Sequence, residues 1–309
     1  MCVRASRHGA TSVKESELAM NFLDQLRGAR QAHHSLLCVG LDPEPSRFPS
    51  HWQGRSDKTF EFCAAIVDAC ADLVLAFKPQ IAYFSALGAE KDLERLMRHM
   101  KDVAPQVPII LDSKRGDIGS TAEQYALEAF ERYGADAITL SPYMGLDSIS
   151  PYLKYHDKGA FLLCRTSNPG GADLQNLRLS SPAGASAQGG VAPERLYEHV
   201  ARLAQHHWNT NGQLGLVVGA TFPEDIERVR RQAPHLPLLI PGIGAQGGDA
   251  QQTLQAAWVN EDTPIVINSS RAVLYASPER DYAQAARAQA LQTRDLLEQA
   301  LTLHLATLA

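Results

Sequence analysis

Residues 107–117 read Val-Pro-Ile-Ile-Leu-Asp-Ser-Lys-Arg-Gly-Asp, an apolar run that ends abruptly in charged side chains. Such a short apolar run with a polar break after it predicts a buried strand over 108–112. Side chains alternate along a strand, so Asp112 and Lys114 are expected on the same side. A carboxylate beside an ammonium group, with Asp117 just beyond, suits the transfer of a proton. A solvated loop of salt bridges is the alternative.

Seven further apolar runs are separated by longer amphipathic stretches. The strands expected in all are 36–41, 73–78, 108–112, 137–140, 160–165, 214–218, 236–240 and 265–268. Helices are expected near 57–71, 89–103, 119–133, 147–155, 193–208, 223–233, 249–258 and 278–306. Eight strands that alternate with helices predict an α/β fold, a (β/α)8 TIM barrel, whose typical length is about 250 residues. A doubly wound sheet has the same alternation and is the alternative.

Polar residues gather just after the expected strands, which favours the barrel. They are Asp42, Lys78, Asp112, Lys114, Ser167, Gln246 and Arg271. The carboxyl ends of barrel strands converge on one face, so these side chains become neighbours there. We expect a single domain over 20–309. The irregular stretch 166–191, rich in Gly, Ser and Ala, follows the fifth strand and is expected to be a lid or binding loop.

The segment Gly-Ile-Gly-Ala-Gln-Gly at 242–247 matches the G-x-G-x-x-G pattern of dinucleotide-binding folds. The context excludes that interpretation, because a Rossmann domain needs most of its sheet after this turn and only one strand follows here. In a barrel, the loops after strands seven and eight are the usual phosphate site. Backbone N–H groups of 242–247 and 268–271, with Arg271 as a bidentate donor, are therefore expected to hold a phosphate. A plain glycine-rich turn is the alternative.

Three other polar positions have a functional and a structural interpretation each. Lys78 ends an apolar strand and is either part of the charged network or a lysine that snorkels to solvent. Asp42 either binds a sugar hydroxyl or caps a turn. Ser167 and Asn168 offer a hydroxyl and an amide that suit the edge of a base, but they also lie in an ordinary Asn-Pro-Gly turn. The pattern of His, Cys and carboxylate residues predicts no metal site.

Bulk composition is that of an ordinary globular enzyme, with 45% hydrophobic and 20% charged residues. A net charge of -5 predicts no nucleic-acid partner and no anionic membrane surface. No apolar run approaches the roughly 20 residues that span a bilayer. The five cysteines form no Cys-x-x-Cys, and Cys38 and Cys164 lie in apolar runs. We therefore expect buried thiols in a reducing compartment, which indicates a cytoplasmic location.

Residues 1–19 contain basic side chains but little apolar content, so they do not form a secretory signal. They are expected to be a disordered extension or the product of an upstream start codon.

Six motifs follow one another along the chain: Gly-Leu-Asp-Pro at 40–43, Phe-Lys-Pro-Gln at 77–80, Leu-Asp-Ser-Lys-Arg-Gly-Asp-Ile-Gly-Ser-Thr at 111–121, Ser-Asn-Pro-Gly at 167–170, Pro-Gly-Ile-Gly-Ala-Gln-Gly-Gly at 241–248, and the arginine after strand eight. With these motifs in this order, the sequence resembles orotidine 5'-phosphate decarboxylase, in its second and longer subfamily. The resemblance runs from about residue 22 to the end. The N-terminal extension has no counterpart in the family pattern, and the loop before Val191 is longer than in the short subfamily.

The resemblance implies decarboxylation of orotidine 5'-monophosphate to uridine 5'-monophosphate without a cofactor, as a step of pyrimidine biosynthesis. It implies a homodimer with shared active sites. The catalytic tetrad would be Lys78, Asp112, Lys114 and Asp117, with Lys114 as proton donor to C6. The other implied roles are ribose binding by Asp42, pyrimidine binding by Ser167, phosphate binding by Gln246, Gly247 and Arg271, and contributions of Asp117, Ile118 and Thr121 to the partner's site.

Two rival functions remain open on the sequence. A hexulose-phosphate synthase-like aldolase shares Asp-x-Lys-x-x-Asp on a barrel but uses magnesium, and the cation of Lys78 hinders a metal site there. A non-catalytic phosphosugar-binding barrel is expected to lack one of the tetrad charges, and all four are present.

Overall fold

The computed structural model describes residues 20–179, 194–243 and 249–308. Its centre is one parallel sheet with the strand order β2-β1-β8-β7-β6-β5-β4-β3. Bridges from Phe77 to Ile109 and from Gln80 to Asp112 join the two outer strands and close the sheet. The strands are β1 Leu37–Leu41, β2 Ala76–Pro79, β3 Ile110–Arg115, β4 Ala137–Leu140, β5 Gly159–Arg165, β6 Leu214–Val218, β7 Leu238–Pro241 and β8 Ile265–Ser269. The predicted (β/α)8 barrel is confirmed, and the doubly wound sheet is excluded.

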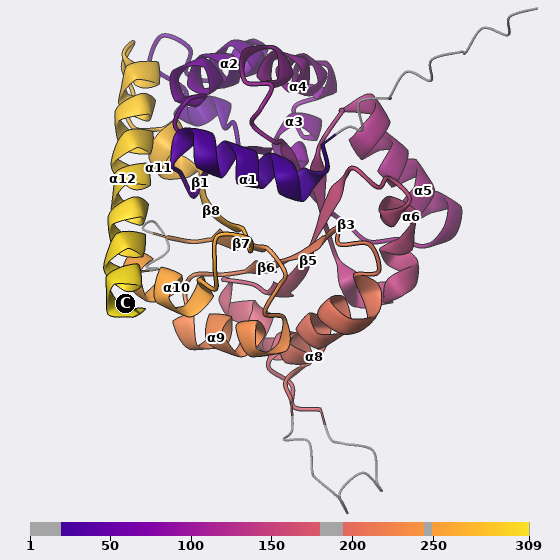
Figure 1. The fold of residues 1–309 in the computed structure, drawn as a ribbon. Coiled ribbons are helices and arrows are strands. Elements are labelled where there is room, and N and C mark those ends of the chain that lie inside the picture. The colour runs from indigo at the N-terminus through magenta and orange to yellow at the C-terminus, as the bar shows by residue number, and fades with distance from the viewer. Residues whose placement is uncertain (1–19, 180–193, 244–248, 309) are drawn as a thin grey trace, which may run out of the picture.

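Helices surround the barrel (Figure 1). The α-helices are α1 Phe22–His33, α2 Thr59–Cys70, α3 Ile81–Ser85, α4 Glu90–Val103, α5 Gly119–Leu127, α6 Ser150–Leu153, α7 Ala172–Gln175, α8 Leu196–Leu203, α9 Pro223–Gln232, α10 Ala250–Ala257, α11 Arg271–Leu274 and α12 Tyr282–Leu308. Short π-helical turns, η3 Glu128–Arg132 and η8 Ala204–Trp208, extend α5 and α8. The 3-10 turns are η1 Pro45–Arg47, η2 Ser56–Lys58, η4 Pro142–Met144, η5 Leu146–Ser148 and η6 Pro169–Gly171.

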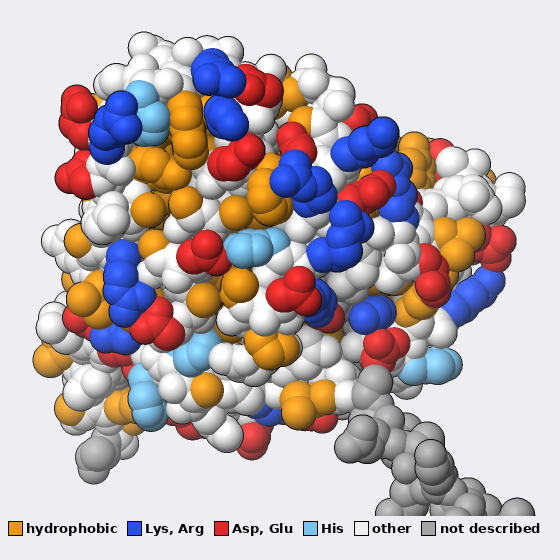
Figure 2. Space-filling view, turned by 90° about the horizontal axis from the view of Figure 1, so that it is seen from above, with side chains coloured by type: hydrophobic (Ala, Val, Ile, Leu, Met, Phe, Trp, Pro, Cys, Tyr) orange, Lys and Arg blue, Asp and Glu red, His pale blue; other side chains and the backbone are white. Residues whose placement is uncertain are grey.

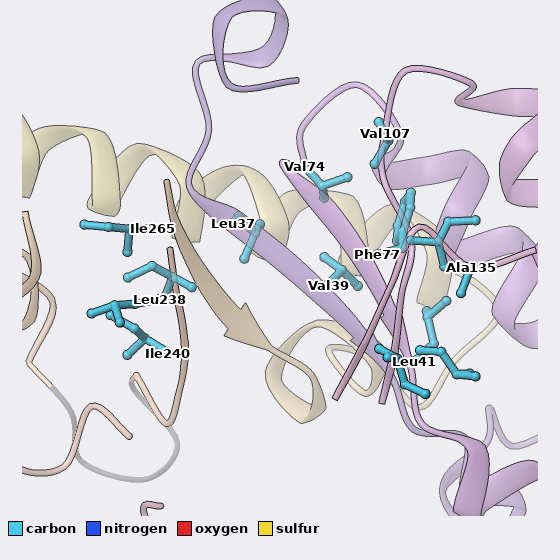
Figure 3. Close-up of a cluster of buried hydrophobic side chains, with 14 of the residues drawn as sticks. Leu37, Val39, Leu41, Val74, Phe77, Val107, Ala135, Leu238, Ile240 and Ile265 are labelled. Carbon is cyan, nitrogen blue, oxygen red and sulfur yellow. The ribbon is translucent and has the colours of Figure 1, made fainter. Parts of the chain in front are cut away.

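Alternating strand residues divide the apolar core into two parts. One set packs between the strands and the outer helices, and Figure 3 shows Leu37, Val39 and Leu41 of β1 in this set. The intervening residues, such as Cys38 of β1 and Leu239 of β7, belong to a separate cluster with the other inward-facing side chains. Strands with both faces buried in this way read as continuous apolar runs, which explains why the sequence located them.

Helix α1 covers the amino-terminal end of the barrel. The backbone N–H of Phe22 donates to the Asp157 carbonyl at 3.0 Å, just before β5 begins. Its ring packs edge-on against Phe161, with 5.8 Å between centroids. A Cβ on Gly159 would lie only 2.2 Å from this ring, so glycine is needed there. The opposite end of the barrel, where the strands finish, is left for the polar residues.

Basic and acidic side chains are interspersed over the surface drawn in Figure 2. Within the described ranges, no helix is both long and apolar enough to cross a membrane.

Candidate active site

A buried ion pair lies at the carboxyl end of the barrel. The Lys78 ammonium of β2 donates to Asp112 Oδ2 of β3 at 2.8 Å. Lys78 is only 5% exposed and Asp112 only 7%. Burying charges in this way costs free energy even when they are paired, and well-packed apolar residues would serve stability as well. The pair therefore points to function, and Lys78 is not a snorkelling surface lysine.

Lys114 joins the same carboxylate from its other side. Its ammonium donates to Asp112 Oδ1 at 2.6 Å, so the expected meeting of these two side chains is confirmed. The strand between them is not regular, because the pairing of β3 with β4 shifts register between Leu111 and Arg115. Lys114 itself has φ 48°, a left-handed conformation that costs a non-glycine residue about 1–3 kcal/mol. Its side chain remains 46% exposed and faces the open mouth.

The two lysines keep Asp112 ionised. Burial alone would raise the pKa of Asp112, but the positive charges of Lys78 and Lys114 outweigh it and hold that pKa well below the usual range. Burial would likewise lower the pKa of Lys78, but the carboxylates of Asp112 and Asp42 outweigh it and hold the pKa above its usual value. Lys78 is thus a cation and Asp112 an anion at neutral pH, and the Lys114 side chain contacts that anion from its other side.

Thr139 of β4, which is not among the site residues expected from the sequence, also contacts Asp112. Its hydroxyl donates to Asp112 Oδ1 at 2.8 Å, and the side chain is 1% exposed. The signal was present in the sequence, since Thr139 is the one polar residue of the buried strand Ala137–Leu140.

A small cavity of about 200 Å³ lies beside Lys78, between β1 and the loops after β7 and β8. Asp42, Gly242 and Arg271 line it together with Lys78 and Asp112. Asp42 Oδ1 is buried, and among the described residues it has no hydrogen-bond partner. An acceptor of this kind at the cavity wall can take a hydrogen bond from a water or from a ligand hydroxyl.

Tyr275 and Gly40 shape this cavity. The Tyr275 hydroxyl donates to the Asp42 carbonyl and accepts from the Glu44 N–H, both at 2.8 Å, which fixes the turn that holds Asp42. A Cβ on Gly40 would lie 1.9 Å from the Ser270 hydroxyl and 3.1 Å from Asn268 Oδ1, so a larger residue would require these side chains to move. Gly242 has φ +103°, which favours glycine. Gln246 and Gly247 lie outside the described residues.

A larger cavity of about 560 Å³ opens on the other side of Lys78 and Asp112. Lys114, Thr139 and Ser167 line it, and Leu163, Val217 and Leu239 are among its apolar walls. Because Lys78 and Asp112 line both cavities, the two lie side by side at the barrel mouth, and we refer to them together as the trough. The trough has a cationic end at Arg271, a charged centre and a partly apolar end.

The loop that carries Ser167 is held by polar contacts of Arg165 and Gln175. Arg165 pairs with Asp225 at 2.8 Å and donates to the Thr166 carbonyl at 2.8 Å. The Gln175 side chain accepts from the Thr166 N–H at 2.9 Å. The first residues of the expected lid or binding loop 166–191 therefore form part of the cavity wall. Residues 180–191 of this loop lie outside the described ranges.

Asp117, Ile118 and Thr121 do not join this trough in their own chain. Asp117 accepts the Ile118 N–H at 2.8 Å, and within the described ranges it forms no ion pair. Ile118 is 50% exposed, and Thr121 is exposed on α5. One chain therefore assembles three of the four charges of the expected tetrad.

The arrangement can bind an anion at one end and stabilise negative charge beside Lys114 at its centre. In the part of the chain that the structure describes, no cluster of three or more His, Cys, Asp or Glu residues is arranged to hold a metal ion.

The fold and the trough define an enzyme of the (β/α)8 class with a buried charged centre at the carboxyl end of its barrel. The chain belongs to the orotidine 5'-phosphate decarboxylase / HUMPS family, whose model matches residues 35–287.

Known proteins agree with this assignment in sequence and in fold. The chain is 67% identical over 281 residues to an orotidine 5'-phosphate decarboxylase of Polaromonas naphthalenivorans, with 91% of this chain and 96% of that protein covered. The structure of Leishmania donovani OMP decarboxylase superposes with a TM-score of 0.77 at 37% identity and covers 92% of this chain and 99% of that one. The structure of Leishmania donovani UMP synthase superposes with a TM-score of 0.76 at 39% identity. The match covers 90% of this chain but 57% of that longer protein.

Proposed function

We propose that this chain decarboxylates orotidine 5'-monophosphate to uridine 5'-monophosphate and carbon dioxide, and that Lys114 protonates C6. The family match and the 67% identical relative support the reaction. The observation that carries the assignment of the centre is the row Lys78, Asp112, Lys114 in the trough. The charge pattern fits a substrate that has a phosphate at one end and a carboxylate at its reacting carbon.

The trough suggests how the substrate lies. The phosphate binds near Arg271 and the loops after β7 and β8, and Gln246 and Gly247 belong to this proposal. Asp42 accepts a hydrogen bond from a ribose hydroxyl through its unpartnered Oδ1. Ser167 reads the pyrimidine from the wall of the larger cavity. This orientation places C6 over Asp112 and Lys114.

The chemical step has to stabilise a carbanion. The bond between C6 and the carboxylate breaks, its electron pair stays on C6, and carbon dioxide leaves. The Lys114 ammonium stabilises this negative charge in a site where the charges are already oriented. It then donates a proton to C6, and its amine regains a proton from solvent. Asp112 repels the substrate carboxylate and, with Lys78, holds Lys114 in position.

We further propose a homodimer with shared sites, in which Asp117, Ile118 and Thr121 serve the partner. Their absence from the trough of their own chain supports this. Ile118 is 50% exposed, and Tyr143 and Met144, in the turn after β4, are 79% and 53% exposed. Large exposed apolar side chains of this kind are typical of an interaction surface.

The domain and the location are proposals as well. We propose that residues 20–309 form one catalytic domain, because α1 at its start closes the barrel. We propose a cytoplasmic location, because Cys38, Cys63, Cys70 and Cys164 carry free, buried thiols.

The rival within the family is a magnesium-dependent aldolase. Lys78 argues against it, since its ammonium contacts Asp112 and its positive charge opposes the binding of a divalent cation to that carboxylate. The experiment is the loss of orotidine 5'-monophosphate absorbance with purified protein, with and without EDTA. Turnover that survives EDTA supports the proposal. Absence of turnover, or turnover that only magnesium restores, would overturn it.

A further inference from the structure

We propose that Thr139 is a positioning residue for decarboxylation: its hydroxyl holds the left-handed bend of β3 and thereby sets the distance from Lys114 to Asp112. The proposal rests on the proposed function of this site. It adds a residue of β4 to a centre otherwise built from β2 and β3.

The hydroxyl of Thr139 is fully used by its neighbours. It donates to Asp112 Oδ1 at 2.8 Å. It accepts the backbone N–H of Ser113 at 3.0 Å and that of Lys114 at 3.0 Å. A hydroxyl offers one donor and two acceptor sites, so none remains for a substrate. Although Thr139 lines the larger cavity, it acts through Asp112 and Lys114.

The backbone of β3 needs this support. The pairing between β3 and β4 passes from Leu111–Ile138 directly to Arg115–Leu140. Three residues of β3 thus stand opposite one residue of β4, and that residue is Thr139. A regular ladder has no carbonyl for the extra N–H groups of Ser113 and Lys114, so they need another acceptor. The Thr139 side chain supplies this acceptor twice.

The same bend fixes the geometry of the charges. Lys114 has φ 48°, which a lysine adopts only when its surroundings enforce it. From this conformation its ammonium reaches Asp112 Oδ1 at 2.6 Å. That oxygen is also the one that accepts from Thr139. One hydroxyl therefore holds both the backbone of the cation and the carboxylate that orients it.

Thr139→Val keeps the shape of the side chain and removes the hydroxyl. We expect kcat to fall about 10- to 100-fold, the cost of small misplacements of reacting groups. The affinity for uridine 5'-monophosphate is expected to stay within about threefold, since Thr139 has no free group for a ligand. Thr139→Ser retains the hydroxyl and should restore kcat to within about threefold. Thr263→Val is the matched control, because it removes a buried hydroxyl before the start of β8, at the opposite end of the barrel.

Amide hydrogen exchange of Ser113 and Lys114 gives a readout that does not depend on turnover. Both amides should be protected in the parent and in Thr139→Ser, and should exchange at least about tenfold faster in Thr139→Val. If Thr139→Val does not fold, Thr139→Ala takes its place. A parent without turnover would contradict the proposed function, while the exchange rates would still decide on Thr139.

Three results would overturn the positioning role. The first is a Thr139→Val enzyme with kcat within twofold of the parent. The second is equal impairment of Thr139→Ser, which would assign the effect to lost methyl packing. The third is unchanged exchange of the Ser113 and Lys114 amides.

Discussion

The Lys114 ammonium lies 2.6 Å from Asp112 Oδ1, while Lys78 holds the other oxygen of the same carboxylate at 2.8 Å. One anion therefore sits between two cations of very different exposure. The Lys78 side chain is buried inside the barrel, whereas the Lys114 side chain remains nearly half exposed at the mouth. The buried cation stabilises the carboxylate, and the exposed one can reach a substrate.

Hybrid dimers test the sharing of sites. Lys114→Ala and Asp117→Ala are each expected to be inactive as pure proteins. In a mixed dimer, one of the two sites would combine an intact Lys114 from one subunit with an intact Asp117 from the other. Random mixing of equal amounts should restore about a quarter of the parental activity, since half the dimers are hybrids with one intact site. No recovery, with exchange of tagged subunits demonstrated by mass spectrometry, would count against Asp117 acting in the partner's site.

The stability of the protein should depend on Asp112 in acid. The folded state holds the pKa of Asp112 below its usual range, because Lys78 and Lys114 outweigh the effect of burial. As the pH falls below about 4, the unfolded chain binds this proton first, so the free energy of unfolding decreases. For one proton the slope is at most about 1.4 kcal/mol per pH unit.

Between pH 2 and 4, the free energy of unfolding of Asp112→Asn should depend less steeply on pH than that of the parent. The difference in slope should be at most that of one bound proton. The measurement is urea unfolding at several pH values, with Asp102→Asn at the exposed end of α4 as the control. An unchanged slope in Asp112→Asn would contradict the electrostatic account of the ion pair.

Asp42 can be tested with ligands that lack one hydroxyl. Loss of a hydrogen bond to a charged acceptor is worth about 1.5–3 kcal/mol, or roughly 10- to 150-fold in affinity. We expect the parent to bind 2'-deoxy- or 3'-deoxyuridine monophosphate more weakly than uridine monophosphate by such a factor, and Asp42→Ala to discriminate by less than about threefold. Calorimetry measures all affinities in one double-mutant cycle. Glu44→Ala, two residues along the same turn, is the control, and equal discrimination by the parent and Asp42→Ala would refute the assignment.

Replacement of Phe22 tests whether the amino-terminal end of the barrel contributes to stability without affecting catalysis. Its ring is buried at the amino-terminal end of the barrel, so Phe22→Ala should lower the free energy of unfolding by about 3–5 kcal/mol. Gln31→Ala, on the exposed face of the same helix, should change it by less than about 0.5 kcal/mol. The kcat of the folded Phe22→Ala protein should match the parent, because the charged centre is at the other end. A large loss of kcat in protein that is still folded would show that the two ends are coupled.

The strands were predictable because both of their faces are buried. Runs such as Ala137–Leu140 and Leu214–Val218 contain almost only apolar residues, and their ends coincide with those expected. The carboxyl ends of barrel strands converge on one face, so Lys78, Asp112 and Arg271, which follow the apolar runs, were expected to lie together. Strand β2 begins three residues later than expected, and β3 begins two residues later and ends three residues later. The first residues of the two expected strands hydrogen-bond to their neighbours outside a regular ladder.

The bend of β3 could not be predicted from the alternation of side chains. Regular alternation puts Asp112 and Lys114 on one face, but it gives Lys114 an extended backbone and offers Thr139 no role. The register shift arises from pairing with a strand about 25 residues away, which is long-range information that no local pattern carries. The packing of the Phe22 ring against Gly159 could not be predicted for the same reason, since it joins segments far apart in the chain.

The replacement of Lys114 by alanine tests the central claim most directly. The measurement is kcat for orotidine 5'-monophosphate together with the affinity for uridine 5'-monophosphate, with Lys91→Ala on the exposed face of α4 as the matched control. We predict that Lys114→Ala loses at least about a thousandfold in kcat, since it removes both the proton donor and the charge that stabilises the carbanion, and that it still binds the product. Near-normal kcat in Lys114→Ala would contradict the account.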